Sequence, residues 1–408
     1  MPYYIGDVAK SRVIDKYVVR PPEVFKKDHD IDIHTNHEVL HIDRNKKEIL
    51  IRDLDKDEEL TKPYDKLIIT TGSRSRKLGV ENEDAPNVFS LKSLLDGKRI
   101  KDYINDKGPK RVVTIGAGFI SLEMAEAFGE LGIENTIVHR RDLPMRQLGK
   151  DIAEMVLDEL SEKGTKFVTD AKISSLDVSN GNVRSVVTDK GRFDADMVLV
   201  SVGFLPNVSL AVDAGLKIGE TGAIWVDERQ RTSDENIYAA GDCVEVKHLI
   251  TGKGVNIALG DLANKQGWVA GENAAGGDIV YPGVLGSAHF KLFDLEVGFT
   301  GLTLSAAQKE GIDAVCETIE GRSRPGLYPG SAPIRVHLVA ERKSRRLIGA
   351  QIAGRDGAGH RINILAAALF GNLSIDDIVD LDLAYAPPFT PTIDPILVAA
   401  RSLLKKMG

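Results

Sequence analysis

A strand that runs into a glycine-rich turn constrains the fold of this chain more than any other feature. The apolar run 112–115 leads into Gly116-Ala117-Gly118, and the small residue Ser121 follows three positions later. The first glycine of such a pattern permits a tight turn, and the second lets backbone N–H groups approach a pyrophosphate at the start of the next helix. Apolar positions at helical spacing over 122–131 and a second strand at 135–138 complete a βαβ unit.

This unit predicts a dinucleotide site that includes Gly116, Gly118, Phe119 and Ile120, although the glycine pattern alone also fits an ordinary strand–turn–helix. The second strand ends in His139-Arg140-Arg141, where an NAD site usually has an acidic residue for the ribose. Two guanidinium groups and an imidazole suit a 2′-phosphate, which a carboxylate repels. We therefore expect NADPH rather than NADH, and the alternative is a solvated basic turn.

Composition excludes several classes of protein. The 408 residues carry a net charge of -7, and 42% of them are hydrophobic, as in a globular protein with sizeable cores. The negative charge favours neither nucleic acid nor an anionic membrane as a partner, and no apolar run reaches the length of a membrane span. Two cysteines, Cys243 and Cys316, form neither a disulfide framework nor a metal-ligand pattern, so we expect no metal and a reducing, cytoplasmic location.

Hydrophobic patterning divides the chain into three domains, one of them discontinuous. Residues 31–70 alternate as a small antiparallel meander, and 85–107 resemble a helical connector. A hairpin-like stretch covers 180–202, small residues at helical spacing cover 256–276, and sheet with helices follows from about 288. An amphipathic helix is predicted over 361–370.

Three further strand ends carry candidate site residues. Thr71-Gly72 ends one buried strand, Gly203 follows another, and Gly241-Asp242 follows a third. A carboxylate at a strand's carboxyl end suits hydrogen bonding to a sugar-like polyol. Each segment alone fits a capping residue or a plain turn equally well.

Taken in this order, these segments resemble the flavoprotein disulfide reductases that bind two dinucleotides. The resemblance covers essentially the whole chain and is closest to the coenzyme A-disulfide reductase and NADH oxidase/polysulfide reductase branch. The segments that carry it are RPGLYPG at 324–330, AYAPPF at 384–389, GETGAIW at 219–225 and NKQGWVAG at 264–271.

The resemblance implies an α/β fold with two Rossmann-like dinucleotide-binding domains and a C-terminal α+β dimerisation domain. The expected boundaries are 1–107 and 228–287 for an incomplete FAD domain, 108–227 for the inserted NAD(P) domain, and 288–408 for dimerisation. Thr71, Gly72, Gly241 and Asp242 would bind FAD. Gly203, which closes the NAD(P) domain, would bind NADPH or NADH.

The resemblance also implies a hydride path from NAD(P)H to the flavin and on to a cysteine that alternates with a coenzyme A mixed disulfide. Tyr328 and Tyr385 would supply phenol hydroxyls across a homodimer interface, and the alternative is that both only pack there. Phe119 replaces the tyrosine that usually covers the flavin. Glu123 matches the carboxylate near the nicotinamide, unless it is simply an acidic residue in a first helical turn.

The redox cysteine itself is missing from the sequence. Neither Cys243 nor Cys316 lies at its position, because the family pattern places it two residues before Met1, ahead of Pro-Tyr-Tyr-Ile. The first βαβ unit of the FAD domain is absent as well, so the chain as printed should bind FAD weakly or not at all, should be unable to form the mixed disulfide, and should expose the edge of the strand 67–70. Either an internal methionine was taken as the start, which we favour, or the protein is a true truncation.

We therefore expect an FAD- and NAD(P)H-dependent reductase of coenzyme A disulfide or another small disulfide or sulfur substrate. The alternatives are an NADH oxidase or polysulfide reductase of the same family, and a catalytically silent NADPH-binding dimer.

Overall fold

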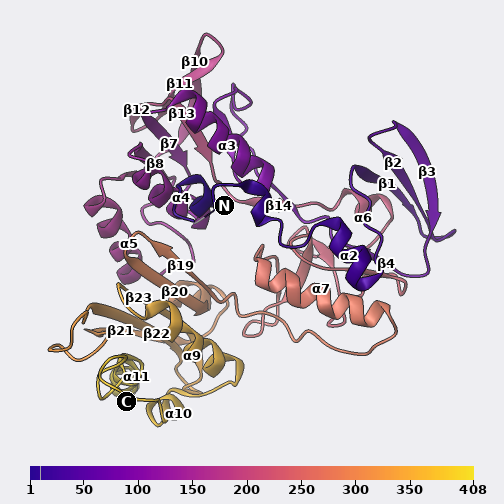
Figure 1. Ribbon diagram of the computed structural model, residues 1–408. Coiled ribbons are helices and arrows are strands. Elements are labelled where there is room, and N and C mark those ends of the chain that lie inside the picture. The colour runs from indigo at the N-terminus through magenta and orange to yellow at the C-terminus, as the bar shows by residue number, and fades with distance from the viewer. Residues whose placement is uncertain (10) are drawn as a thin grey trace. The chain divides into compact units, whose positions relative to one another are not determined.

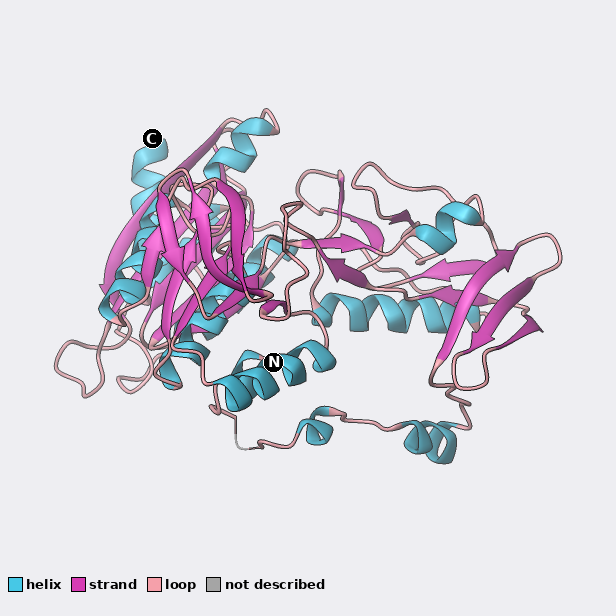
Figure 2. Ribbon diagram, turned by 90° about the horizontal axis from the view of Figure 1, so that it is seen from above, coloured by secondary structure: helices cyan, strands magenta, loops and turns pink. Residues whose placement is uncertain are grey.

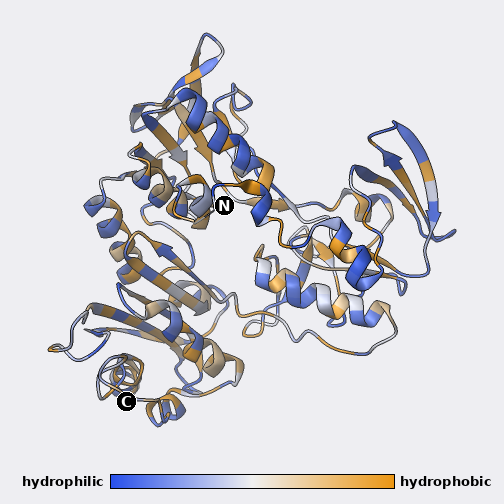
Figure 3. Ribbon diagram, in the orientation of Figure 1, coloured by the Kyte–Doolittle hydropathy of each residue, from blue (hydrophilic) through white to orange (hydrophobic). Residues whose placement is uncertain are grey.

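A five-stranded parallel sheet contains the glycine-rich turn. Its strand order is β6 (Val88–Ser90), β13 (Met197–Val200), β7 (Arg111–Ile115), β8 (Glu134–Val138) and β9 (Lys166–Val168). The helices between these strands are α3 (Leu94–Lys107), α4 (Phe119–Glu130) and α5 (Lys150–Glu162). The central strands β7 and β13 are almost wholly buried, and Figure 3 colours them mainly as hydrophobic. The βαβ unit predicted from the sequence is therefore confirmed.

A three-stranded antiparallel sheet packs beside the parallel one. It consists of β10 (Ile173–Ser179), β11 (Asn182–Thr188) and β12 (Gly191–Asp194). Leu176, Val183 and Val186 of this sheet share a core with Val113 and Val198 of the parallel sheet. The predicted hairpin at 180–202 thus becomes β11 and β12, followed by the buried strand β13.

The C-terminal region is a five-stranded antiparallel sheet with helices. Its strand order is β19 (Ala288–Leu292), β20 (Leu295–Gly301), β23 (Leu347–Gly354), β22 (Pro333–Glu341) and β21 (Ala314–Arg322). The helices are α8 (Leu304–Lys309), α9 (Ala358–Phe370), α10 (Ile375–Val379) and α11 (Pro395–Met407). The helix predicted at 361–370 is α9, which packs against β20 and β23.

One hydrophobic core joins the C-terminal sheet to the dinucleotide-binding region. It contains Leu122 and Ala125 of α4 and Ile152 of α5, together with Phe290 of β19 and Phe299 of β20. The short helix α1 (Pro2–Ile5) packs against α3 and α4 on the same body. These regions therefore form one compact unit, made of Met1–Arg12, Ser75–Gly203 and Leu285–Gly408.

A second compact unit comprises Val13–Arg74 and Phe204–Val284. The computed structural model describes residues 1–9 and 11–408 (Figure 1). Elements of the second unit are η1 (Ile14–Tyr17), α2 (Pro22–His29), β1 (His37–Asp43), β2 (Glu48–Asp53), β3 (Glu58–Pro63), β4 (Leu67–Ile69), β5 (Ser73–Ser75, which extends one residue past the boundary), β14 (Phe204–Pro206), α6 (Ser209–Asp213), β15 (Ile224–Trp225), β16 (Ile237–Ala239), β17 (Val244–Lys247), β18 (Gly254–Val255) and α7 (Gly260–Ala274).

Strands β1, β2 and β3 of this unit form an antiparallel meander over 37–63, inside the range 31–70 predicted from the sequence. Strand β4 pairs in parallel with β16, and α7 packs against both strands (Figure 2). The two strands form a sheet of their own, and Ile68 in β4 is 37% exposed. Among the described residues, β4 pairs with β16 alone, which leaves its other edge without a strand partner, in line with the edge expected for 67–70. Within the described part of the chain, no helix is long and apolar enough to cross a bilayer.

Candidate functional site

The glycine-rich turn lies where β7, β8 and β13 end. Gly116 has φ +106°, and its backbone N–H donates to the carbonyl of Val138 at 2.9 Å. A Cβ at Gly116 would lie 2.1 Å from the carbonyl oxygen of Ser201. Only glycine fits this position, because any side chain would force the three strand ends apart.

Helix α4 begins directly after this turn with its first N–H groups uncapped by a side chain. Gly118 is the N-cap residue, and a Cβ there would meet no atom within 4 Å. The helix dipole and free N–H groups make such a terminus a site for a phosphate group. Ile120 is half-buried in the first turn, and Ser121 is fully buried. The residues present therefore fit a dinucleotide pyrophosphate.

Three arginines gather beside this turn. Arg140 and Arg141 follow β8, as the sequence indicates, and the pKa of Arg146 is lowered by burial and by the charges of Arg141 and Arg140. Burial and the same two arginines lower the pKa of His139. Within the described residues, we find no hydrogen bond or ion pair of these three guanidinium groups. Unpaired positive charge held together in this way suits a phosphate.

Arg146 is the residue that our sequence reasoning missed. The segment from Arg140 returns to the glycine turn, where the N–H of Met145 donates to the carbonyl of Ala117 at 3.1 Å. A third arginine, six positions after Arg140, was the available signal, but only the fold shows that the chain turns back at Met145.

Phe119 begins α4 and packs against the C-terminal sheet. Its ring centroid lies 5.5 Å from that of Phe290, edge to face, and 5.7 Å from that of Phe299, stacked at 27°. Seven residues later, the buried carboxylate of Glu126 accepts hydrogen bonds from Lys291 Nζ at 2.7 Å and from the backbone N–H of Phe293 at 2.9 Å. Two anchors on one helix face thus hold the start and the middle of α4.

Glu123 lies between these anchors and is half-buried. Burial raises its pKa; the N-terminal ammonium group of Met1 opposes this increase, and the nearby Glu126 carboxylate adds to it. Burial and the same two carboxylates raise the pKa of Tyr3, on α1, to about 12. A carboxyl group with a raised pKa near a nucleotide site is a candidate for a functional role.

The second unit contains the residues predicted to bind FAD. Gly241-Asp242 follows the end of β16 by one residue, and the Ser73 hydroxyl donates a 2.8 Å hydrogen bond to Asp242 Oδ2. The N–H of Gly241 donates to Gln266 Oε1 on α7 at 2.7 Å, and Asn256 Nδ2 donates to the carbonyl of Asp242 at 2.8 Å. This fixed carboxylate fits a sugar or ribityl hydroxyl group.

The motif at Thr71-Gly72 contacts another predicted motif. Thr71 Oγ1 donates to the carbonyl of Asn207 at 2.7 Å, and Asn207 Nδ2 donates back to the carbonyl of Thr71 at 2.9 Å. The N–H of Asn207 also donates to the carbonyl of Gly72 at 2.9 Å. Gly203, which has φ +106°, precedes this segment in the chain. Two motifs that the sequence presents separately are thus one hydrogen-bonded pair.

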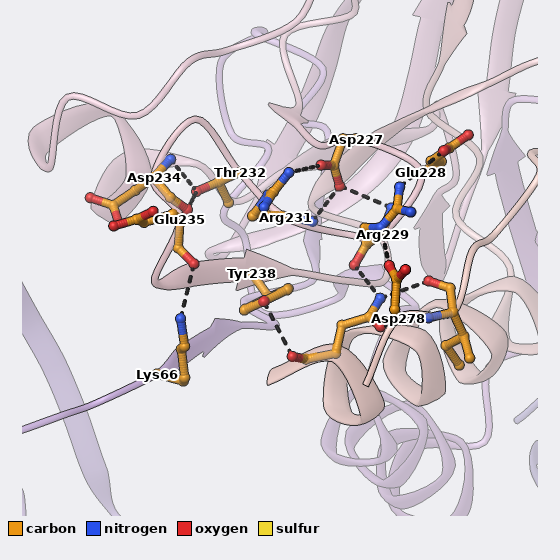
Figure 4. Close-up of polar contacts among 12 residues, drawn as sticks. Lys66, Asp227, Glu228, Arg229, Arg231, Thr232, Asp234, Glu235, Tyr238 and Asp278 are labelled. Carbon is orange, nitrogen blue, oxygen red and sulfur yellow. Dashed lines mark hydrogen bonds and ion pairs between the residues drawn. The ribbon is translucent and has the colours of Figure 1, made fainter. Parts of the chain in front are cut away.

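A polar network holds β16 in place (Figure 4). The Asp227 carboxylate accepts hydrogen bonds from the backbone N–H groups of Arg229 and Arg231, both at 2.9 Å. The Tyr238 hydroxyl donates to the carbonyl of Asn273 at 3.3 Å, and Asn273 Nδ2 donates to the carbonyl of Arg229 at 3.0 Å. The network connects the turn before β16 to the end of α7, and so fixes the strand that leads into Gly241-Asp242.

The two tyrosines expected to act on the substrate both lie in the C-terminal region. Tyr328 is half-buried, with the Arg324 guanidinium 6.0 Å from its ring centroid. Tyr385 is 50% exposed, and its hydroxyl accepts a 3.4 Å hydrogen bond from Thr392 Oγ1. A cavity of ≈ 280 Å³ lies near Tyr328, lined by Ile319, Gly321, Arg322, Arg324, Pro325, Gly326, Pro391, Ile393, Pro395 and Val398.

Three basic residues of this region have partners within the chain. Arg324 makes a bidentate ion pair with Asp356 at 3.0 and 2.6 Å, and Arg335 donates to Glu320 at 3.1 Å. Arg322 donates to the side chain and the carbonyl of Ser331. A ligand phosphate must therefore compete with these contacts.

Neither cysteine is poised to react. Cys243 is fully buried, its Sγ contacts the carbonyl of Ala240 at 3.3 Å, and burial raises its thiol pKa. Cys316, on β21, is half-buried, and burial raises its pKa too. Nucleophilic thiols have lowered pKa values. In the described part of the chain, no group of His, Cys, Asp and Glu could hold a metal ion.

Curated relatives match the chain over nearly its whole length. An NAD(P)H sulfur oxidoreductase (CoA-dependent) of Pyrococcus furiosus is 39% identical over 99% of this chain and 89% of that protein. A coenzyme A disulfide reductase of Staphylococcus aureus is 30% identical over 97% of this chain and 88% of that protein.

Solved structures also match the chain over nearly its whole length. An NAD-dependent persulfide reductase from A. fulgidus has a TM-score of 0.96 and 39% identity, over 99% of this chain and 75% of that one. An engineered water-forming NADPH oxidase bound to NADPH has a TM-score of 0.94 and 26% identity, over 100% of this chain and 89% of that one. Residues 3–267 match the pyridine nucleotide-disulphide oxidoreductase family and 287–395 match its dimerisation domain, so the chain belongs to the pyridine nucleotide-disulphide oxidoreductases.

Proposed function

We propose that this protein reduces coenzyme A disulfide with electrons from NADPH. The reaction balances as NADPH plus a proton plus one disulfide giving NADP⁺ and two coenzyme A thiols. The observation that carries the proposal is the match over almost the whole chain to a CoA-dependent sulfur oxidoreductase and to a coenzyme A disulfide reductase. FAD and a nicotinamide dinucleotide are the cofactors of the family.

Gly116, Gly118 and the start of α4 would hold the nicotinamide dinucleotide, with Gly203 at the end of its domain. Thr71, Gly72, Gly241 and Asp242 would hold FAD. A bound flavin would supply the chemistry of accepting a hydride from the nicotinamide and passing electrons to sulfur. The role of the chain's own residues is to fix the pyrophosphate, to bind sugar hydroxyls and to orient Glu123 near the nicotinamide.

The preference for NADPH rests on Arg140, Arg141 and Arg146. The engineered oxidase that binds NADPH carries two substitutions that introduce arginine six positions apart, the same spacing as between Arg140 and Arg146. The guanidinium groups described above have no competing acidic partner within the described residues. A 2′-phosphate can therefore occupy the space that they share.

The proposed reaction needs a reactive thiolate, which Cys243 and Cys316 do not supply. The cysteine that the family resemblance places ahead of Met1 stays a prediction. Tyr328 and Tyr385 would donate hydrogen bonds to a thiolate in a homodimer, for which the matched dimerisation domain at 287–395 is the support.

The acceptor is tested by measuring anaerobic and aerobic NADPH consumption with coenzyme A disulfide, polysulfide and oxygen. We expect the highest kcat/KM with coenzyme A disulfide and two thiols released for each NADPH. A rate with oxygen alone would support the second candidate, an oxidase like the structurally similar water-forming enzyme. If the protein has no bound flavin and consumes NADPH with none of these acceptors, the result would support the catalytically silent nucleotide-binding dimer.

A further inference from the structure

The segment that carries the three arginines runs from His139, after β8, to Gly149, before α5. Its first part is fixed inside the nucleotide-binding region. The N–H of His139 donates to the carbonyl of Val168, and the carbonyl of His139 accepts from the N–H of Ala171, both at 2.9 Å. We call residues 139–149 the basic loop.

The middle of the basic loop is fixed to the glycine turn. Met145 is buried with a left-handed φ of +48°, and its N–H donates to the carbonyl of Ala117 at 3.1 Å. A methionine adopts this conformation only where the surroundings hold it. Arg146 follows directly, so its placement depends on how the rest of the loop is held.

The end of the basic loop is held by the C-terminal sheet. The N–H of Gly149, the N-cap residue of α5, donates to Gln351 Oε1 on β23 at 2.6 Å. Gln351 is 2% exposed, and α5 begins without a side-chain cap of its own. An amide from another region thus gives a partner to the partly buried N–H at the start of the helix.

A second contact holds the first turn of α5. Thr318 Oγ1 on β21 donates to Asp151 Oδ2 at 2.5 Å and lies 2.7 Å from His337 Nδ1 on β22. Because the single hydroxyl hydrogen goes to Asp151, His337 Nδ1 must donate to Thr318. Arg335 also donates to the carbonyl of Asp151 at 3.1 Å. Side chains from three strands therefore hold Gly149 and Asp151.

We propose that Gln351 and the Thr318–His337 pair are positioning residues that set the discrimination between NADPH and NADH. This inference rests on the proposed NADPH preference. The three arginines belong to the basic loop, whereas the start of α4 is anchored separately through Phe119 and Glu126. Removing the hydrogen bond to the N–H of Gly149 should therefore weaken the contact between the three arginines and a 2′-phosphate. The contact between the start of α4 and the pyrophosphate should stay in place.

The test compares Gln351→Leu, which removes the acceptor, with Gln351→Glu, which keeps an oxygen at the same place. Ile352→Val is the matched control, because this buried neighbour lies on the same strand. Dissociation constants for NADPH and NADH are measured by nicotinamide fluorescence, and KM and kcat by steady-state kinetics. The protein is used with its flavin bound, and thermal unfolding is recorded for each variant.

Gln351→Leu should raise Kd and KM for NADPH by up to about fivefold, because NADPH binding must then supply the order that one ordinary hydrogen bond gave the basic loop beforehand. The values for NADH should change less than twofold, kcat should be unchanged, and Gln351→Glu should restore NADPH binding. An equal rise for both nucleotides, or no change for either, would overturn the proposal. If Gln351→Leu does not fold, Thr318→Val removes the second contact and should give the same selective loss.

The test separates failure of this inference from failure of the proposed nucleotide preference. If Arg140→Ala with Arg141→Ala leaves the ratio of NADPH to NADH affinity unchanged, the proposed preference is wrong. If that double variant abolishes the preference but neither Gln351→Leu nor Thr318→Val affects it, only the positioning role is wrong.

Discussion

The Ser73 hydroxyl donates a 2.8 Å hydrogen bond to the Asp242 carboxylate, so the acid predicted to bind FAD is fixed by its own unit before any ligand arrives. A carboxylate held in this way gives up little conformational entropy when a sugar hydroxyl binds. The finding leads to a prediction about flavin content.

Asp242→Ala should weaken FAD binding by about 2 kcal/mol, because it removes a charged acceptor. Ser73→Ala should have a smaller effect, since the carboxylate remains but is less fixed. Flavin released from purified protein by denaturation measures the outcome. Asp43→Ala is the control, since this acid lies in the meander; a flavin content for Asp242→Ala equal to that of this control would contradict the assignment.

Removing the positive charge of the basic loop should change nucleotide selectivity. Arg140→Ala with Arg141→Ala should weaken the binding of NADPH more than that of NADH. The difference should be about 2 kcal/mol, because charge-assisted contacts with the 2′-phosphate are lost. Arg146→Ala alone should give part of this loss. Arg99→Ala, an exposed arginine on α3, is the control. Equal losses for the two nucleotides would show that the loop does not bind the 2′-phosphate.

Much of the fold follows from the sequence, because local patterns determine it. The βαβ unit around Gly116 and the meander at 31–70 both form as predicted, since hydrophobic period and turn residues are local signals. Three other contacts join residues far apart in the chain. Ser73 donates to Asp242, Met145 beside Arg146 donates to Ala117, and Gln351 accepts from the N–H of Gly149 at the start of α5. No spacing rule reveals such contacts, because only the packed core brings the segments together.

The packing of Phe119 also depends on residues far away in the chain. The resemblance implies an aromatic ring that covers the flavin, and this role stays a prediction. The structure adds that the ring packs against Phe290 and Phe299, which no local pattern indicates.

Phe119→Ala should lower the free energy of unfolding by about 2 kcal/mol, less than for a fully buried phenylalanine because the ring is only half-buried. Phe119→Tyr should retain most of that stability. Urea unfolding measures both variants. A loss for Phe119→Ala no larger than that for Phe370→Ala, an exposed ring on α9, would contradict the packing role.

Stability should depend on pH through His337. Burial lowers its pKa below the ordinary 6.5, although Asp151 and Glu317 oppose the shift and Lys406 adds to it. The unfolded chain therefore binds more protons than the folded chain between the lowered pKa and 6.5, so stability falls as pH drops through this range. Above that range His337 contributes no pH dependence.

His337→Asn, which has no titrating group, should lose less stability than the natural protein between about pH 7.5 and 5.5. Urea unfolding at both pH values measures the difference. Parallel decreases in the two proteins would show that other groups cause the pH dependence.

The most direct test is an anaerobic titration of the native protein, purified from its natural source and with its mass measured, first with NADPH and then with coenzyme A disulfide, while the visible absorbance of the flavin is recorded. We predict a flavin band that NADPH bleaches and that the disulfide restores, with two thiols formed for each NADPH. A protein of the mass expected for 408 residues with no flavin band, or a reduced flavin that the disulfide fails to reoxidise, would contradict the proposed function.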